Sequence, residues 1–354
     1  MIWPKAYRHA TADSVAMLLR CEENVFDRTQ RESIFYKFGR LLLREDYFSS
    51  SLDATFRARS SAVIRLMTGR PPIYWQTTRT FARRMPIRSA ATAILLKNNI
   101  RAIYPQFGLT LKVSNPQDAA STGRILNEAT KRKSIHTAGG FTVPDIISSN
   151  DHAESPFILE TLLENHRPFT ASDMDADFVS GFVKFQLANR TDSLALTKDL
   201  SPGTAISQFE SLMRVANLDI PPRLFQFLQA AAAKAAIAQP VSLCHGDLSR
   251  SNILVSGKVF TVIDWEFSQV APSAIDAVRL ATQFPGFARA YIKELGHPDA
   301  RAWVVLGCVY AANAHAERLQ GLAVNRHQHL AWRKTARKLA EITALADRLA
   351  MQEI

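Results

Sequence analysis

The pattern of hydrophobic and polar positions changes along the chain. Short runs of β-branched and aromatic residues occupy its middle part, a pattern typical of strands. The predicted strands cover residues 109–113, 141–147, 156–163, 253–255 and 260–263. Apolar residues spaced three and four apart predict helices. These cover residues 14–19, 34–43, 62–67, 122–133, 290–292, 303–312 and 327–351. The chain therefore has strands mainly in its middle and helices towards both ends.

The composition is that of an ordinary globular protein. The 354 residues are 47% hydrophobic and 21% charged, and they suffice for two lobes with a buried core. The apolar segment 303–312 has 10 residues, which predicts a buried helix and not a membrane span. The N-terminus lacks the charged-then-apolar order of a secretion signal. The three cysteines show no pairing or metal spacing. Both features favour a cytoplasmic protein.

Positive charge is concentrated near the N-terminus. Residues 1–100 hold 17 Lys and Arg against 8 Asp and Glu, so they carry +9 of the net charge of +11. Its main clusters are Arg57, Arg59 and Arg65, and then Arg79, Arg83, Arg84 and Arg88. Such a patch attracts anions, for example a phosphorylated glycolipid or a membrane surface in peripheral contact. Scattered arginines fit a solvated surface equally well. Nucleic acid is the least favoured partner, because no aromatic strand platform or recognition helix accompanies the charge.

One stretch of polar residues between apolar runs has the layout of a phosphoryl-transfer site. It reads Leu-Cys-His-Gly-Asp-Leu-Ser-Arg-Ser-Asn-Ile-Leu-Val over residues 243–255 and Val-Ile-Asp-Trp-Glu over residues 262–266. In this layout Asp247 accepts the proton of an attacking hydroxyl, Asn252 holds one magnesium ion, and Asp264 holds the metal ions against the nucleotide phosphates. A turn containing glycine joins the two flanking strands, so we expect Asn252 and Asp264 at the ends of paired strands.

The stretch resembles the signature of the aminoglycoside phosphotransferase and choline kinase group, which are protein-kinase-like small-molecule kinases. That signature is His-Gly-Asp, an Asn five residues after the Asp, and then Ile-Asp-Trp-Glu or a near variant. Protein kinases have His-Arg-Asp instead, so Gly246 favours a small-molecule substrate. The resemblance implies catalytic roles for His245, Asp247 and Asn252, and metal binding by Asn252 and Asp264.

The same resemblance implies a two-lobed α+β fold of protein-kinase type. It extends over about residues 85–285. We expect a basic helical N-terminal extension over residues 1–78, a small and mainly antiparallel β N-lobe over residues 79–163 that ends in a hinge, and a helical C-lobe over residues 164–354. The implied cofactors are ATP and Mg²⁺, and the implied acceptor is a hydroxyl group of a small molecule or glycan.

A kinase-like fold needs a lysine on a strand and a glutamate on the next helix to hold the phosphates. Lys112 lies near the end of the predicted strand 109–113, and Glu128 lies on the predicted helix 122–133. We therefore expect Lys112 to contact the α- and β-phosphates and Glu128 to hold Lys112 in place. A solvated surface lysine is the alternative. Lys97 is a competitor, but no helix with a glutamate follows it closely.

Two further segments are candidates for nucleotide binding. Backbone groups near Glu160 and Leu162, in the segment expected to form the hinge, would pair with the adenine edge. No Gly-x-Gly-x-x-Gly sequence precedes the strand lysine. The small residues from Ser89 to Thr92 are therefore our candidates for a loop that covers the phosphates with backbone N–H groups.

Several residues around and after the signature also have a predicted role. Asp276 either braces the catalytic loop or simply favours the helix dipole. We expect Trp265 and Cys244 in the core, with Cys244 as a small apolar side chain and not a nucleophile, and Glu266 partly as a polar wall of the substrate site. Candidates for an acceptor pocket on the later helices are Tyr310, His315 and Arg318. Taken singly, each is better explained as core or as the polar face of a helix.

Alternatives to a small-molecule kinase stay open. The missing glycine loop also fits a regulatory kinase-like protein that binds a nucleotide or a partner without turnover. A protein kinase is less favoured, because no Ala-Pro-Glu of an activation segment is evident after Asp264.

The charge pattern bears on the acceptor. A cationic acceptor needs an acidic or aromatic pocket, and acids are sparse from residue 301 onwards. They are Glu317, Glu341, Asp347 and Glu353. A neutral or anionic acceptor, such as a sugar or a phosphorylated lipid-linked glycan, suits a chain of net charge +11 better.

Overall fold

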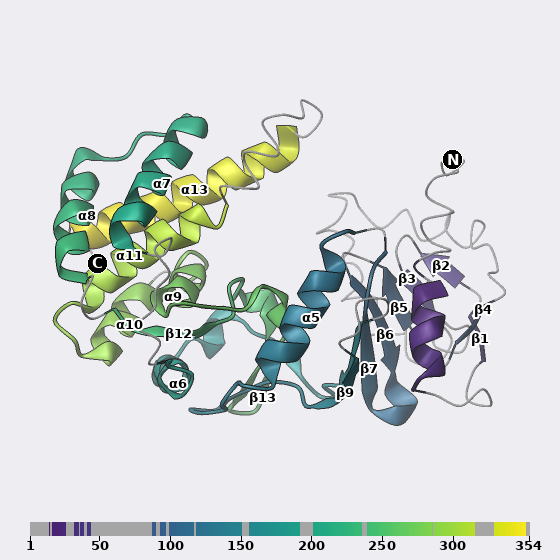
Figure 1. Ribbon diagram of the computed structural model, residues 1–354. Helices are drawn as coiled ribbons and strands as arrows, with labels where there is room; N and C mark the ends of the chain where they lie inside the picture. The colour runs from purple at the N-terminus through teal and green to yellow at the C-terminus, as the bar shows by residue number, and fades with distance from the viewer. Residues whose placement is uncertain are drawn as a thin grey trace. The chain divides into compact units, whose positions relative to one another are not determined.

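The computed structural model shows two compact units (Figure 1). The first unit comprises Met1–Lys133 and Pro144–Glu164, and the second comprises Ser134–Val143 and Asn165–Ile354. The residues that the structure describes are 14, 16–25, 32–34, 36–38, 41–43, 87–89, 93–96, 99–116, 118–150, 156–191, 201–235, 239–284, 286–315 and 329–351.

An antiparallel sheet forms the centre of the first unit. Its strands lie in the order β2-β3-β5-β6-β7-β10-β9. They are β2 (Tyr36–Phe38), β3 (Leu41–Leu43), β5 (Ala93–Leu96), β6 (Asn99–Tyr104), β7 (Leu109–Ser114), β9 (Ile146–Asn150) and β10 (Phe157–Thr161). Two more strands, β1 (Glu32–Ile34) and β4 (Ile87–Ser89), pair with each other. Long connections separate several neighbours in this sheet, so its full order was not evident from local sequence.

Helices pack on both faces of this sheet. One face contacts a helix within residues 14–23 through a core that includes Leu18, Cys21, Leu111 and Val113. The other face contacts α5 (Ser121–Arg132), where Ile125 and Ala129 pack on Ile158 of β10. Lys112 of β7 lies opposite Ile158 in the register. Directly opposite residues of paired strands share a face, so Lys112 points towards α5.

The predicted helix over residues 34–43 is wrong. Its described residues form the end of β1, β2 and β3, and β3 pairs with β5 of the main sheet. The segment contains several aromatic residues, which favour strands, and over ten residues helical spacing and alternation are hard to separate. The predicted helix at residues 14–19 is confirmed, although it packs on the sheet. The described residues therefore do not form the separate helical extension that we predicted for residues 1–78. The predicted helix at 62–67 lies outside them.

Strands of the second unit form two small sheets. One has the order β11-β13-β14-β8, with strands β11 (Arg167–Pro168), β13 (Ile253–Ser256), β14 (Val259–Val262) and β8 (Phe141–Thr142). The other pairs β12 (Val241–Cys244) with β15 (Gln269–Pro272). The predicted strand over residues 141–147 is thus two strands, because the chain passes from the second unit to the first between Val143 and Pro144. Residues 134–143, placed in the N-lobe by our domain prediction, belong to the second unit.

Helices supply most of the second unit. They are α6 (Ala176–Ala188), α7 (Pro202–Val215), α8 (Pro222–Ala235), α9 (Ala274–Ala281), α10 (Phe287–Leu295), α11 (Ala300–Asn313) and α13 (His329–Ala350). Helix α11 packs against α7, α9 and α13 (Figure 1), and its residues 303–312 are buried, as predicted. A Cβ atom on Gly307 would lie 2.8 Å from Cβ of Ala274, so glycine lets α11 approach α9 closely.

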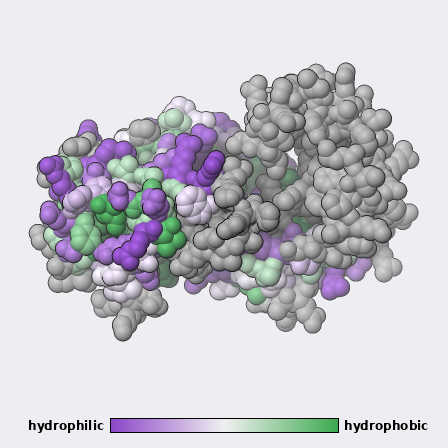
Figure 2. Space-filling model, turned by 90° about the horizontal axis from the view of Figure 1, so that it is seen from above, coloured by the Kyte–Doolittle hydropathy of each residue, from purple (hydrophilic) through white to green (hydrophobic). Residues whose placement is uncertain are grey.

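The described helices do not combine enough length with enough apolar character to cross a membrane. On the face shown in Figure 2, hydrophilic and hydrophobic residues are intermixed over the coloured surface. Exposed large apolar side chains such as Leu187, Val215 and Val259 come from different elements.

Candidate active site

Asp276 of α9 anchors the start of the candidate catalytic loop, which we define as residues 245–252. The backbone N–H groups of His245 and Gly246 donate hydrogen bonds to the two Asp276 carboxylate oxygens, at 2.6 Å and 3.0 Å. Burial raises the pKa of Asp276, and the nearby His245 and the two backbone donors oppose that rise. Of the two interpretations of Asp276, these hydrogen bonds confirm the brace, and the residue also lies in the first turn of α9.

Gly246 meets two steric demands in this loop. Its φ is +80°, a left-handed conformation that side-chain-bearing residues rarely adopt. A Cβ atom at this position would lie 2.2 Å from the backbone oxygen of Phe267. Glycine is thus required by packing, independently of any substrate preference that the signature indicates.

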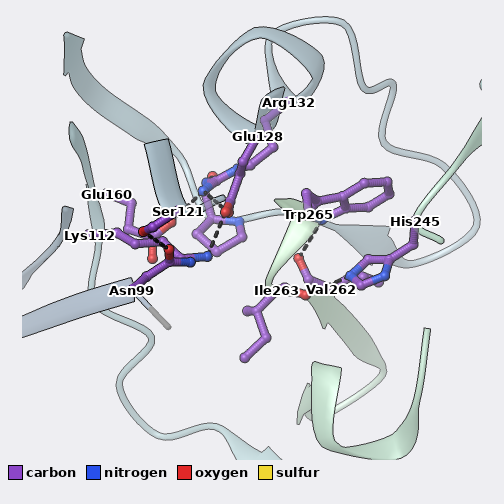
Figure 3. A network of polar contacts seen from close by, with 11 residues as sticks. Asn99, Lys112, Ser121, Glu128, Arg132, Glu160, His245, Val262, Ile263 and Trp265 are labelled. Carbon is purple, nitrogen blue, oxygen red and sulfur yellow. Dashed lines mark hydrogen bonds and ion pairs between the residues drawn. The ribbon is translucent and has the colours of Figure 1, made fainter. Parts of the chain in front are cut away.

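The His245 ring links the loop to the strand that precedes Asp264. Its Nδ1 accepts a hydrogen bond from the Asp247 backbone N–H at 3.2 Å, so Nε2 carries the proton and donates to the Ile263 oxygen at 2.8 Å (Figure 3). The residue is 1% exposed, and its ring packs on Trp265, which is buried in the core as predicted. Both ring nitrogens serve the protein backbone. His245 therefore positions the loop, and the catalytic role that we predicted for it stays a prediction.

Asn252 and Asp264 lie at the ends of paired strands, as predicted. Asn252 ends η5 (Arg250–Asn252) just before β13, and Asp264 follows β14. The two strands pair in register, and the Ile263 N–H donates to the backbone oxygen of Asn252 at 3.0 Å. Asn252 Nδ2 also donates to the backbone oxygen of Asp247 at 3.0 Å. These bonds bring the three predicted residues of the loop and strand end into one compact arrangement.

Asp264 adopts a strained backbone conformation. Its φ is +65° and its ψ is +56°, in the left-handed region where a residue other than glycine is uncommon. Such strain persists where the surroundings impose it, and it is frequent at functional sites. The short η6 (Trp265–Phe267) begins directly after Asp264 and fixes the direction of the chain beyond it.

Asp247 is accessible and lies beside a cation that sequence reasoning missed. Its side chain is 49% exposed, and Nη1 of Arg279 is 3.6 Å from its Oδ1. The same Nη1 is 3.4 Å from Nε2 of His315. Arg279 follows the bracing Asp276 by three residues on α9, a spacing that puts both on one helix face. That spacing is the signal that could have identified Arg279.

Three other residues that the sequence singled out are buried. Cys244 is fully buried, and burial raises the pKa of its thiol, so it is a core residue and not a nucleophile. Tyr310 and His315 are also buried. Arg318 and the N-terminal arginines from Arg57 to Arg84 lie outside the described residues, as does the predicted membrane contact that depends on those arginines.

The first unit contains the predicted lysine and glutamate pair. Lys112 Nζ is 2.5 Å from Glu128 Oε2, and both side chains are buried (Figure 3). Strand β7 and helix α5, which carry them, have nearly the bounds that the sequence predicted. The competitor Lys97 lies outside the described residues.

The predicted hinge residues lie at the end of β10, with Glu160 inside the strand and Leu162 directly after it. Glu160 is paired within the sheet, and its carboxylate accepts a hydrogen bond from Arg132. The Leu162 N–H donates to the Gly108 oxygen at 2.8 Å. An adenine contact at Leu162 would therefore involve its carbonyl oxygen.

Sheet topology does not support the predicted phosphate-covering loop. Ser89 ends β4, which pairs with β1, while Thr92 lies outside the described residues. In kinases the lysine lies on the third strand, and the covering loop joins the two strands that come before it along the chain. In this chain the two strands before β7 are β5 and β6, and residues 97–98 join them. The predicted segment from Ser89 to Thr92 precedes β5 and is not that connection.

Comparisons with known proteins identify a family and a fold for this chain. Residues 98–305 match the model of the phosphotransferase enzyme family. A GDP complex of a mutant aminoglycoside 2′-phosphotransferase-IIIa shares 11% identity, with a TM-score of 0.50, over 83% of this chain and 97% of that chain. A choline/ethanolamine kinase family protein from Mesorhizobium loti shares 15% identity, with a TM-score of 0.47, over 72% of this chain and 89% of that chain. Curated proteins gave no match. The predicted α+β, kinase-like fold is confirmed.

Proposed function

We propose that this chain, which belongs to the phosphotransferase enzyme family, transfers a phosphoryl group from ATP, with Mg²⁺, to a hydroxyl of a neutral or anionic small molecule or glycan. The observation that carries this proposal is the joint placement of Asp247, Asn252 and Asp264 by one loop and one strand pair. These three residue types match the acceptor-orienting and metal-holding parts of kinases.

The donor atoms at Asn252 and Asp264 fit magnesium. An amide oxygen and a carboxylate are hard oxygen ligands, and Mg²⁺ in kinases needs few protein ligands because substrate phosphates supply others. The hydrogen bond from Asn252 Nδ2 to the backbone oxygen of Asp247 engages the amide nitrogen, so Oδ1 is the atom that would hold the metal. Bound there, magnesium would neutralise charge on the transferred phosphoryl group.

The protein's own residues would supply the remaining functions. Asp247 is half-exposed, so an acceptor hydroxyl can reach it, and its carboxylate would orient that hydroxyl and accept its proton. Lys112, held by Glu128, would contact the α- and β-phosphates. His245 would keep Asp247 in position through the loop. Catalysis would thus rest on positioning and charge stabilisation.

Arg279 supports an acceptor without positive charge near its reacting hydroxyl. Its guanidinium lies beside the Asp247 carboxylate, and the two opposite charges largely cancel for an approaching group. An ammonium group of an aminoglycoside or an amino alcohol would gain little attraction at this point. A sugar hydroxyl or the hydroxyl of an anionic glycan meets no such disadvantage.

A transfer assay with labelled ATP and Mg²⁺ tests the proposal. Candidate acceptors should include aminoglycosides, amino alcohols, sugars and lipid-linked glycans, and we expect transfer to a neutral or anionic member. A protein that binds ATP but transfers phosphate to no acceptor would favour the regulatory alternative. Transfer to a protein substrate in preference to small molecules would favour a protein kinase.

Two substitutions test the roles within the site. Asp247→Asn and Asp264→Asn should each lower turnover by about 10² or more, the size of general-base and electrostatic contributions. Asn tolerates the left-handed conformation of residue 264, so the fold should persist. Asp264→Asn should also weaken Mg²⁺-dependent nucleotide binding, whereas Asp247→Asn should not. Asp177→Asn, at an exposed aspartate paired with Lys258, is the matched control and should leave turnover unchanged. Normal transfer by either site variant would disprove its assigned role.

A further inference from the structure

Four buried charged side chains form one cluster in the first unit. They are Lys112, Glu128, Arg132 and Glu160, which we call the charge cluster (Figure 3). The lysine and glutamate belong to the expected phosphate-binding pair. The arginine and the second glutamate extend that pair from α5 to β10, and no function has been assigned to this extension.

Arg132 is the centre of the extension. Its Nη1 is 3.3 Å from Glu128 Oε1 and also donates to Glu160, while its Nη2 donates to the Pro144 oxygen. Glu128 uses its other oxygen, Oε2, for Lys112. One glutamate therefore lies between two cations, and one arginine joins helix α5 to strand β10 and to the point where the chain re-enters the first unit.

The charges of the cluster balance in number, with two cations and two carboxylates. The Arg132 side chain is 1% exposed, so water contributes little to its stabilisation. Loss of one member of a buried ionic group leaves an uncompensated charge, which is strongly unfavourable. Without the Arg132 guanidinium, Glu128 and Glu160 would both lose a buried cationic partner, and α5 would lose an ionic link to β10.

The opposite end of α5 is held independently. Ser121 Oγ donates to Asn99 Oδ1 at 2.6 Å and accepts from the Asn115 N–H at 2.7 Å. These contacts attach the first turn of α5 to β6 and to the residue after β7. Helix α5 is thus attached at its start by Ser121 and at its last residue by Arg132.

We propose that Arg132 is a positioning residue for nucleotide binding, which fixes the Lys112–Glu128 pair by tying α5 to β10. The phosphate lysine and the strand that leads into the expected hinge then keep a set geometry before any nucleotide binds. This inference rests on the proposed role of Lys112 in binding nucleotide phosphates.

A double-mutant cycle on ADP binding, measured by calorimetry with Mg²⁺, tests the proposal. The variants are Arg132→Lys, Lys112→Met and the double variant. Lysine keeps the charge at residue 132 but lacks the planar, multi-donor group that reaches three acceptors. Arg132→Lys should raise the Kd for ADP about tenfold in the wild-type background and less than about twofold in the Lys112→Met background. A purely structural role would give equal effects in both backgrounds.

Arg124→Lys is the matched control, because Arg124 lies on the same helix and pairs with Asp118 at 2.5 Å outside the cluster. It should leave the Kd unchanged. If Arg132→Lys does not fold, Glu160→Gln replaces it in the cycle and should weaken binding in the same Lys112-dependent way. An unchanged Kd, or an additive cycle, overturns the role of Arg132. Absence of ADP binding by the wild-type protein would instead refute the proposed nucleotide dependence.

Discussion

At the scale of single residues, the form of the catalytic loop follows from a few steric and polar requirements. Gly246 is in a left-handed conformation under the Phe267 backbone, and its N–H group is bound by Asp276. His245 bridges two backbone groups with one tautomer. Asp247 is therefore placed by its neighbours and needs no rigid contact of its own, which suits a carboxylate that must meet a substrate.

Gly246→Ala should disable the loop, and Gly257→Ala provides a matched comparison. Both residues have positive φ, but the space around a Cβ at Gly257 is open. Each variant should lose about 1–2 kcal/mol of stability from the left-handed backbone. The clash at residue 246 should add about 1–3 kcal/mol and displace Asp247, which lowers turnover at least about tenfold. Urea unfolding and phosphotransfer assays would measure both effects. Equal turnover in the two variants would contradict the steric argument.

The sequence predicted the site residues that lie close together along the chain. It did not predict those that approach the site only through packing of distant elements. Asp247, Asn252 and Asp264 stand at fixed spacings around a hairpin, so their proximity was predictable. Arg279 reaches Asp247 from a later helix. Arg132 carried a signal that went unused, since it is a charged residue on the apolar face of an amphipathic helix, four positions after Glu128.

At the scale of elements, periodicity succeeded where an element is long or its pattern is unmixed. Helix α5 and the final helix α13 agree closely with their predicted ranges, because each repeats its spacing over several turns. The predictions for short segments were wrong. Strands β2 and β3 have three residues each, and three residues cannot distinguish alternation from helical spacing. The predicted strand 141–147 failed because its two halves belong to different units.

The short helix η3 (Ala171–Asp173) provides a test of pH dependence at this scale. Hydrogen bonds from Arg167 hold the pKa of Asp173 well below its usual range, and Thr170 donates to the same carboxylate. A lowered folded-state pKa stabilises the protein above the unfolded-state pKa of about 3.9, and this contribution is lost as the pH falls further.

Asp173→Asn should therefore lower the free energy of unfolding at pH 7 by about 0.5–1 kcal/mol, since its partner Arg167 is largely exposed. The difference from wild type should shrink as the pH falls below about 4. Urea titrations between about pH 3 and 7 would measure it. Arg167→Gln should show the same convergence, and a difference that stays constant with pH would refute the linkage.

At the scale of the whole molecule, chemistry and charge lie in different parts of the sequence. The loop and metal-binding residues fall between residues 245 and 264, whereas residues 1–100 carry +9 of the net charge of +11. Local motifs could predict the loop and metal-binding residues, because kinase chemistry needs few residue types at set spacings. Local motifs could not identify a partner for the positive charge of residues 1–100, since a basic surface attracts many kinds of anion.

Replacing Arg57, Arg59, Arg83 and Arg84 together with Gln tests the role of that charge. If these arginines attract an anionic acceptor, the apparent KM for it should rise and its dependence on salt should flatten, because exposed charges are screened over about 8 Å at physiological ionic strength. The KM for ATP and the rate at saturating acceptor should change little, because these residues lie outside the motif that performs the chemistry. Steady-state kinetics with one charged and one neutral acceptor over a salt series would separate the effects. Equal losses with both acceptors would mean that the N-terminal arginines are structural, and the electrostatic role would then be rejected.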